Sequence, residues 1–266
     1  MGLESHRKLP VINFSEKNLK PGSSAWTSTC NDVQRALEEC GCFEAKFEKM
    51  SPQVYEVAFA GAEELFGLPT EVKMKNTSNK QPYFEYLGQY QSLPLYESLA
   101  IDHPTSFDAT ASFTNLMWPT GNDSFRKNTN NLLRYFKYNE PKMEQSNAGL
   151  LPHADKTLFS IIHQGKVSGL QLKLKDDQWV DVPPLPTSFY CHCWRSIDVI
   201  LKEKGTRYSL GMFSFISGTV HILEEQGGET HPIKYKSFDH FEFLHFVKLN
   251  LGPNSNPCLV KDFTGV

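Results

Sequence analysis

The chain has 266 residues, of which 39% are hydrophobic and 12% aromatic, enough apolar material for one large or two small globular domains. Its formal net charge of -3 at pH 7 gives no electrostatic reason to expect nucleic acid or an anionic membrane surface as a partner. No apolar run approaches the roughly 20 residues that cross a bilayer, and residues 1–6 lack the apolar stretch of a signal peptide. We therefore expect a cytoplasmic monomer, with no membrane partner, that binds a small molecule.

The six cysteines do not predict a disulfide framework, because the chain is long and carries no secretion signal. Reduced thiols are the simpler interpretation. The Cys191-His192-Cys193 cluster leaves one structurally unrelated alternative, a zinc-binding interaction module, although its spacing is shorter than that of ordinary zinc sites. The cysteines are Cys30, Cys40, Cys42, Cys191, Cys193 and Cys258.

In the first hundred residues, the pattern predicts two short strands and two helices. Residues 9–14 and 41–45 have strand character, and residues 25–39 carry apolar side chains at helical spacing. Residues 54–66 form a second amphipathic pattern, which Gly67 and Pro69 end. Residues 78–108 show no periodicity, so we expect a structured loop there.

The second half has the pattern of an all-β unit. Short β-propensity runs with turn residues between them predict a sandwich or barrel of jelly-roll type. A helix is expected from Phe238, with His240 and His245 on it, followed by an irregular stretch at 252–257. The runs are residues 157–163, 170–174, 179–182, 207–215 and 219–223.

His153 and Asp155 stand two residues apart at the mouth of one predicted strand, so their side chains share a face. An imidazole and a carboxylate on one face supply two of the three ligands of the facial triad that holds non-haem Fe(II). A surface turn would explain the same short pattern. The pair alone is therefore a weak signal for a metal site.

Arg207 lies on an otherwise apolar strand, with Ser209 on the same face. A buried arginine needs an anion, because an unpaired buried charge is costly. The planar guanidinium fits a carboxylate through two hydrogen bonds. The anion could be the carboxylate of a bound dicarboxylate or that of an Asp or Glu in the chain.

Together these motifs resemble the plant iron(II)/2-oxoglutarate-dependent dioxygenase family. The family's motifs occur in the same order, as His-x-Asp, Gly-Leu-Gln, Trp-Val-x-Val and Arg-x-Ser. Here they stand at residues 153–155, 169–171, 179–182 and 207–209. Segments 18–24 and 94–99 are similar to the AOP-like group, whose namesakes modify glucosinolate side chains. The resemblance runs from about residue 9 to about residue 246.

The resemblance implies a mixed α/β protein, a double-stranded β-helix (jelly roll) with the N-terminal helices packed outside. It implies an oxidoreductase that oxidises a small molecule of plant specialised metabolism, coupled to decarboxylation of 2-oxoglutarate to succinate, with ascorbate as reductant. His153 and Asp155 match two Fe(II) ligands. Arg207 and Ser209 match the residues that bind 2-oxoglutarate, and Tyr138 matches a tyrosine near the same carboxylate.

The chain departs from the family at the third iron ligand. The family has a histidine ten residues before the arginine, where this chain has Ile197, and an alkyl side chain cannot coordinate iron. His192 is the one histidine nearby and is a candidate replacement, although an ordinary histidine in a rebuilt loop is the simpler interpretation. The alternatives are therefore a catalytically inactive member or the product of a truncated gene model.

Before the position of Ile197, the family has roughly twenty residues where the chain has only residues 190–196, so we expect some jelly-roll strands to be missing. The helix that backs the family's barrel is replaced by a short polar stretch at residues 124–131. The expected organisation is an N-terminal helix and strand region at 1–108 and a shortened connecting segment at 109–131. An incomplete jelly-roll domain follows at 132–249, with an irregular tail at 250–266.

Overall fold

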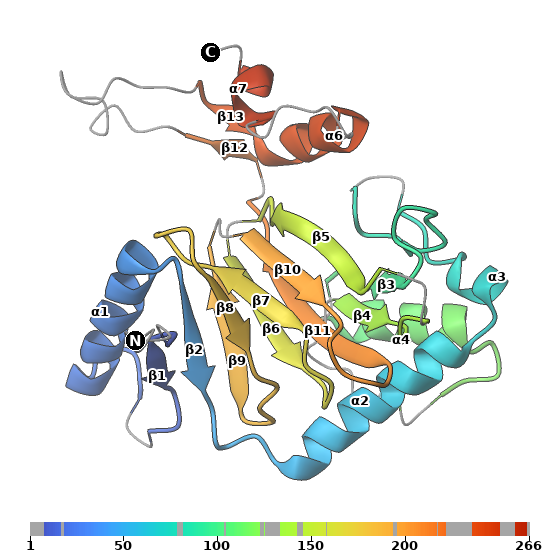
Figure 1. The fold of residues 1–266 in the computed structure, drawn as a ribbon, viewed down its shortest axis with the longest axis horizontal. Helices are drawn as coiled ribbons and strands as arrows, with labels where there is room; N and C mark the ends of the chain where they lie inside the picture. The colour runs from blue at the N-terminus through green and yellow to red at the C-terminus, as the bar shows by residue number, and fades with distance from the viewer. Residues whose placement is uncertain are drawn as a thin grey trace, which may run out of the picture.

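The computed structural model describes most of the chain and orders it into two large β-sheets and one small two-stranded sheet, with helices outside the large sheets (Figure 1). The described residues are 8–16, 19–78, 82–103, 105–122, 125, 134–142, 146–157, 159–193, 196–216, 218–221, 236–250 and 259–264.

The larger sheet has seven strands and the smaller has four. In spatial order the larger sheet contains β1 (Val11–Asn13), β2 (Cys42–Lys46), β9 (Ser188–His192), β6 (Phe159–Gln164), β11 (Arg207–Ser214), β4 (Arg134–Tyr138) and β3 (Tyr96–Ala100). The smaller sheet contains β5 (Ala148–Ala154), β10 (Ser196–Ile200), β7 (Leu170–Lys173) and β8 (Trp179–Val182).

The eight consecutive strands β4 to β11 divide equally between the two sheets, in the orders β9-β6-β11-β4 and β5-β10-β7-β8. All neighbours within these two sets pair antiparallel. This is an eight-stranded jelly roll. The expectation of missing strands was wrong, because β9 and β10 both form and only residues 193–195 connect them. Both strands are therefore present, and the connection between them is short.

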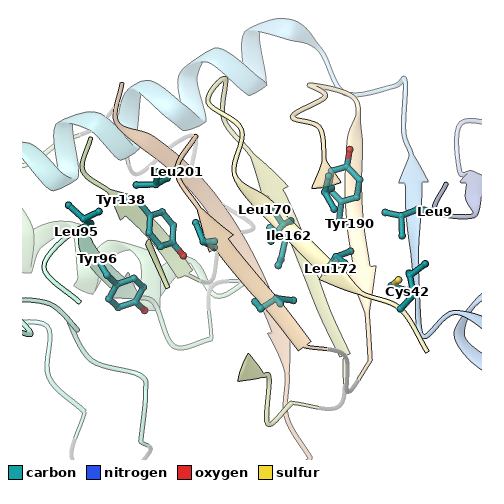
Figure 2. Packing of buried hydrophobic residues seen from close by; sticks show 14 residues of the cluster. Leu9, Cys42, Leu95, Tyr96, Tyr138, Ile162, Leu170, Leu172, Tyr190 and Leu201 are labelled. Atoms are coloured by element: carbon teal, nitrogen blue, oxygen red, sulfur yellow. The ribbon is translucent and has the colours of Figure 1, made fainter. Parts of the chain in front are cut away.

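The main core fills the space between the two sheets (Figure 2). Inward-facing positions alternate along the strands, as period-two geometry requires. Tyr138 from β4, Ile162 from β6 and Tyr190 from β9 meet Leu172 from β7 and Ile197 from β10 there. Both sheets therefore share one interior.

The N-terminal region adds strands and helices to this barrel. Helix α1 (Ser24–Glu39) begins at Ser23, whose side chain accepts a hydrogen bond from the Trp26 backbone. Helix α2 (Pro52–Gly67) begins in the same way at Ser51 and has proline in its first turn. Part of the segment expected to be a loop instead forms β3, which pairs with β4 at the sheet edge.

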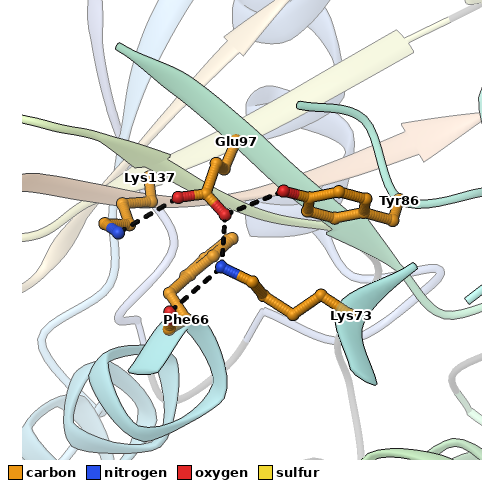
Figure 3. Close-up of polar contacts among 5 residues, drawn as sticks. All are labelled: Phe66, Lys73, Tyr86, Glu97 and Lys137. Carbon is orange, nitrogen blue, oxygen red and sulfur yellow. Dashed lines mark hydrogen bonds and ion pairs between the residues drawn. The ribbon is translucent and has the colours of Figure 1, made fainter. Parts of the chain in front are cut away.

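A buried ion-pair network fixes β3 to the short helix α3 (Thr70–Lys73) (Figure 3). Glu97 on β3 accepts hydrogen bonds from Lys73, Lys137 and the Tyr86 hydroxyl. Lys73 also donates to the Phe66 carbonyl at the end of α2. Both charged side chains of the central pair are more than nine-tenths buried. The two lysines lower the pKa of Glu97 below its usual value, although burial alone would raise it.

The C-terminal region forms a small separate cluster beyond β11, at the top of Figure 1. It contains β12 (Thr219–Val220), β13 (Phe238–Asp239), the expected helix α6 (His240–Asn250) and α7 (Leu259–Thr264). The tail that we expected to be irregular contains helix α7. This helix is held in place by Leu259, which packs against Phe243 and Val247 of α6. The expected irregular stretch at 252–257 lies outside the described residues.

A cavity of about 1620 Å³ lies on the outer face of the seven-stranded sheet, between α1 and α2. Its lining is mostly apolar and includes outward-facing side chains of β6 and β9, among them Ile161, Phe189 and Cys191. Helix α4 (Phe107–Met117) precedes the short polar stretch at 124–131, of which only Phe125 is described. Among the described residues, no helix has the length and apolarity needed to cross a membrane.

Candidate functional site

His153 and Asp155 lie side by side where β5 ends. The Nε2 atom of His153 is 3.4 Å from Oδ1 of Asp155. The other ring nitrogen, Nδ1, lies 2.9 Å from the Leu151 carbonyl oxygen. A proton on Nδ1 would satisfy that carbonyl and leave Nε2 as the atom available to a metal. Burial lowers the pKa of His153, but the Asp155 carboxylate that Nε2 faces raises it further.

The second oxygen of Asp155 faces β6 and β9. Oδ2 accepts a hydrogen bond of 2.7 Å from the Ser160 hydroxyl, and it lies 3.3 Å from Nε2 of His192. Burial raises the pKa of Asp155, but the two neighbouring imidazoles lower it further than burial raises it. Asp155 is therefore ionised at neutral pH, as a metal ligand must be.

His192 is the last residue of β9 and points into the barrel. It pairs in register with Ser160 of β6, and its side chain has no exposed surface. Neither ring nitrogen makes a hydrogen bond in the structure. Sequence reasoning placed this histidine in a rebuilt loop, whereas it lies on a strand beside Asp155.

Ile197 lies next to the same site. It pairs in register with His153, so the two side chains project from the same face of the smaller sheet. It is 5% exposed and belongs to the main core. The position that carries a histidine in the family therefore faces the barrel interior here, but its side chain offers no donor atom.

Arg207 is buried in the barrel interior, with 1% of its surface exposed. It donates hydrogen bonds to Gln164 Oε1 at 2.8 Å and to Ser209 Oγ at 3.1 Å, while its Nε has no partner. The guanidinium carbon lies 5.1 Å from the centre of the Tyr138 ring. No carboxylate of the described residues forms an ion pair with Arg207, and burial lowers its pKa.

The inward face of β6 connects the two groups. Ser160 contacts Asp155, Gln164 contacts Arg207, and Ile162 lies between them in the core. The backbone positions of Ser160 and Gln164, four residues apart on the strand, are roughly 13 Å apart. The long side chain of Arg207 extends from β11 into the same interior. Burial raises the pKa of Tyr138, and the charges of Arg207 and Asp155 both act on its hydroxyl. One interior thus contains both the candidate metal ligands and the candidate anion site.

Sequence reasoning missed Ser160 and Gln164. The signal was present, because residues 157–163 have a strand pattern and two polar residues at positions 160 and 164 share a face with Ile162. Polar residues on an inward strand face need partners. Nothing in the sequence indicated which partners these would be.

The five cysteines that the structure describes do not form a zinc cluster. None of Cys30, Cys40, Cys42, Cys191 and Cys193 forms a disulfide. Cys191 packs on the outer face of the sheet, away from His192, and burial raises its pKa to about 12, so the thiolate that binds zinc is disfavoured. Within the described part of the chain, no three His, Cys, Asp or Glu side chains stand ready in the arrangement of a metal centre.

Comparison with known proteins identifies two matching family models. The model described as non-haem dioxygenase in morphine synthesis, N-terminal, matches residues 9–119, and the model of the 2OG-Fe(II) oxygenase superfamily matches residues 128–214. The chain is 35% identical over 301 residues to the probable 2-oxoglutarate-dependent dioxygenase AOP1.2 of Arabidopsis thaliana, covering 92% of each protein.

Solved structures share the fold. The dioxygenase for auxin oxidation from rice superposes with a TM-score of 0.74 at 18% identity, covering 96% of this chain and 99% of that one. Its counterpart from Arabidopsis thaliana, solved with 2-oxoglutarate, gives a TM-score of 0.71 at 18% identity, covering 85% and 100%. The family models, the AOP-type relative and the jelly roll agree, and the chain belongs to the 2-oxoglutarate- and Fe(II)-dependent dioxygenases, a family of oxidoreductases.

Proposed function

We propose that the protein oxidises a small molecule of plant specialised metabolism, using Fe(II) held at His153 and Asp155 and 2-oxoglutarate held at Arg207. The observation that supports this most strongly is the buried Arg207, which lacks a carboxylate partner among the described residues. A buried cation without a counter-ion is costly. The distal carboxylate of 2-oxoglutarate would supply that counter-ion.

The residues around Arg207 suit a carboxylate. Gln164 and Ser209 each accept one hydrogen bond from the guanidinium and hold it in place, while Nε is unpartnered. The Ser209 hydroxyl can turn to donate its own proton to an incoming carboxylate oxygen. The Tyr138 hydroxyl, protonated because burial raises its pKa, is a further donor that can serve the same carboxylate.

The residues at the other end suit a divalent cation. Asp155 supplies charge, and Ser160 holds its carboxylate. His153 has its Nδ1 engaged by Leu151, so that Nε2 is the ligand atom. Fe(II) bound there would supply the redox chemistry by which O2 oxidises both the substrate and 2-oxoglutarate, the latter losing CO2 to give succinate. Ascorbate would keep the iron reduced, and the protein would act as a cytoplasmic monomer.

The direct test is binding followed by turnover. Calorimetry with Mn(II), which occupies Fe(II) sites without oxygen chemistry, should show metal-dependent binding of 2-oxoglutarate to the purified protein. Succinate formation with Fe(II), ascorbate and 2-oxoglutarate should then be measured with and without a panel of plant small molecules. The proposal fails if 2-oxoglutarate does not bind to the folded, metal-loaded protein.

A catalytically inactive relative is the second candidate, and Ile197 is the observation that favours it. Two protein ligands hold a metal less firmly than three, and carboxylate-rich metabolites can compete for it. The two candidates differ in one measurement. An inactive protein would bind 2-oxoglutarate at Arg207. With every substrate tested, however, it would form no more succinate than a control reaction without metal.

A further inference from the structure

We propose that His192 is the third protein ligand of the metal site, contributed by β9 in place of the residue that β10 would contribute at Ile197. This inference rests on the proposed function, because it concerns the same metal site. The ligand would come from β9 in the larger sheet, whereas the family's usual position lies on β10 in the smaller sheet.

The burial of His192 is the first argument. Its side chain has no exposed surface, and neither Nδ1 nor Nε2 makes a hydrogen bond. Leaving a buried polar group without a partner costs about 1–3 kcal/mol. Nδ1 therefore has no partner, and Nε2 has only the Asp155 carboxylate at 3.3 Å; a metal ion would give Nε2 a direct partner.

The spacing of the donor atoms is the second argument. Nε2 of His192 lies 3.3 Å from Oδ2 of Asp155, and Nε2 of His153 lies 3.4 Å from Oδ1. Adjacent ligands at right angles on a metal, each about 2.1 Å from it, are about 3 Å apart. Two imidazoles already flank one carboxylate at nearly that separation. As they stand they contact the carboxylate rather than surround a common point, so binding requires their rings and the carboxylate to turn toward a cation.

The short connection between β9 and β10 explains why a histidine of β9 can reach the site. Residues 193–195 alone join the two strands, which belong to opposite sheets. The end of β9 is therefore held close to the start of β10, where Ile197 pairs with His153. The pairing of His192 with Ser160 then places the histidine beside Asp155.

Supporting contacts hold two of the three ligands in orientation. Ser160 pairs in register with His192 and donates to Asp155, and the Thr157 and Ser160 hydroxyls are 2.8 Å apart. Leu151 holds His153. Contacts of this kind orient metal ligands in proteins. With a metal bound at His153, Asp155 and His192, Nδ1 of His192 would be the one ring nitrogen that contacts neither the metal nor a protein group.

The test counts imidazole ligands without relying on activity. Cu(II) is bound to the full-length protein at one equivalent, and the nitrogen hyperfine pattern in its electron paramagnetic resonance spectrum is recorded. The wild type should show two imidazole nitrogens, and His192→Ala and His192→Gln should each show one. The affinity for Mn(II), measured by calorimetry, should fall at least about tenfold in both variants. Removing a residue that only supports a metal ligand already costs roughly 10- to 100-fold, so loss of a ligand should cost no less.

His192→Gln separates a ligand from a side chain that only stabilises the carboxylate, because the glutamine amide can donate a hydrogen bond to Asp155 Oδ2, which Nε2 of the histidine faces at 3.3 Å. If His192 only stabilises the carboxylate, the glutamine variant should bind Mn(II) like the wild type, and the assignment is then wrong. His163→Gln is the matched control. His163 is also buried, on the neighbouring strand β6, but its ring stacks on Phe189 on the outer face of the sheet. This variant should bind metal as the wild type does.

The same preparations distinguish this inference from the proposed function. If the His192 variants keep the wild-type metal affinity and the wild type binds 2-oxoglutarate, only the His192 assignment fails. If the wild type binds neither Mn(II) nor 2-oxoglutarate while it melts cooperatively, both fail. A single imidazole in the wild-type Cu(II) spectrum would also overturn the assignment.

Discussion

At the scale of single residues, Arg207 gives the sharpest prediction about the cosubstrate. Arg207→Ala should weaken binding of 2-oxoglutarate to the Mn(II)-loaded protein by about 2–5 kcal/mol, because it removes one partner of a buried charged pair. The comparison ligand is 2-oxobutyrate, which lacks the distal carboxylate. Wild-type protein should strongly prefer 2-oxoglutarate, and the preference should disappear in Arg207→Ala when both affinities are measured by calorimetry.

The control for this prediction is Arg35→Ala, which removes the same charge from an exposed ion pair on α1. It should leave both affinities unchanged. If Arg207→Ala weakens the two ligands equally, the arginine acts through folding or general charge, and its assignment to the distal carboxylate is wrong.

Residues of the candidate site were predictable where they form short motifs. Side-chain alternation and the cost of burying a charge singled out His153, Asp155 and Arg207, and the family resemblance gave them their candidate roles. His192 was not predictable as a neighbour of Asp155, because its position depends on pairing between β9 and β6, which are distant in sequence. Ser160 and Gln164 were detectable as inward polar residues, but their partners depend on the tertiary structure.

At the scale of elements, the strands with long apolar or β-branched runs were the predictable ones. Trp179 to Val182 was predicted with the observed bounds. Strands β9 and β10 were missed because they follow one another with only residues 193–195 between them, and the sequence comparison suggested a deletion. A loop can shorten while both strands survive, since each strand is stabilised by its neighbours in its own sheet rather than by the connection.

The ion-pair network of β3 leads to a prediction about stability. Glu97→Gln should lower the free energy of unfolding by about 3–5 kcal/mol, because it leaves the buried Lys73 without its counter-ion. Glu56→Gln, which breaks an exposed ion pair with Lys166, should change it by at most about 1 kcal/mol. Urea unfolding at pH 7 measures both. Equal effects of the two variants would show that burial of the Glu97 pair does not matter.

The same network makes stability depend on pH. In the folded protein, burial raises the pKa of Glu97, but Lys73 and Lys137 lower it further, to below its ordinary value of 4.5. The stabilisation is therefore complete above that value and is lost as the pH falls through the lower folded pKa. Wild-type protein should lose stability in this acidic range more steeply than Glu97→Gln, which has no carboxyl group to protonate. Parallel slopes between pH 5 and pH 3 in urea unfolding would contradict this origin.

At the scale of the whole molecule, the two faces of the larger sheet serve different purposes. The inner face carries the candidate site, and the outer face borders the cavity between α1 and α2. The jelly roll could be predicted from the sequence because its motifs occur in a fixed order. The cavity could not, because it depends on how far apart the two helices pack.

The cavity leads to a final prediction. An apolar hollow of about 1620 Å³ is large enough to hold a small apolar dye, so the native protein should increase the fluorescence of Nile red, which carries no charge. Val33→Glu on α1 places a carboxylate in the lining and should weaken dye binding at least about tenfold, because burying an unpaired charge costs more than 1.4 kcal/mol.

Val57→Glu on α2, outside that lining, is the matched control and should bind the dye as the wild type does. Binding of Mn(II) should be the same in all three proteins, since the candidate metal ligands lie on the other face of the sheet. If Val33→Glu and the wild type bind the dye with equal affinity, the dye does not occupy this cavity and the prediction is wrong.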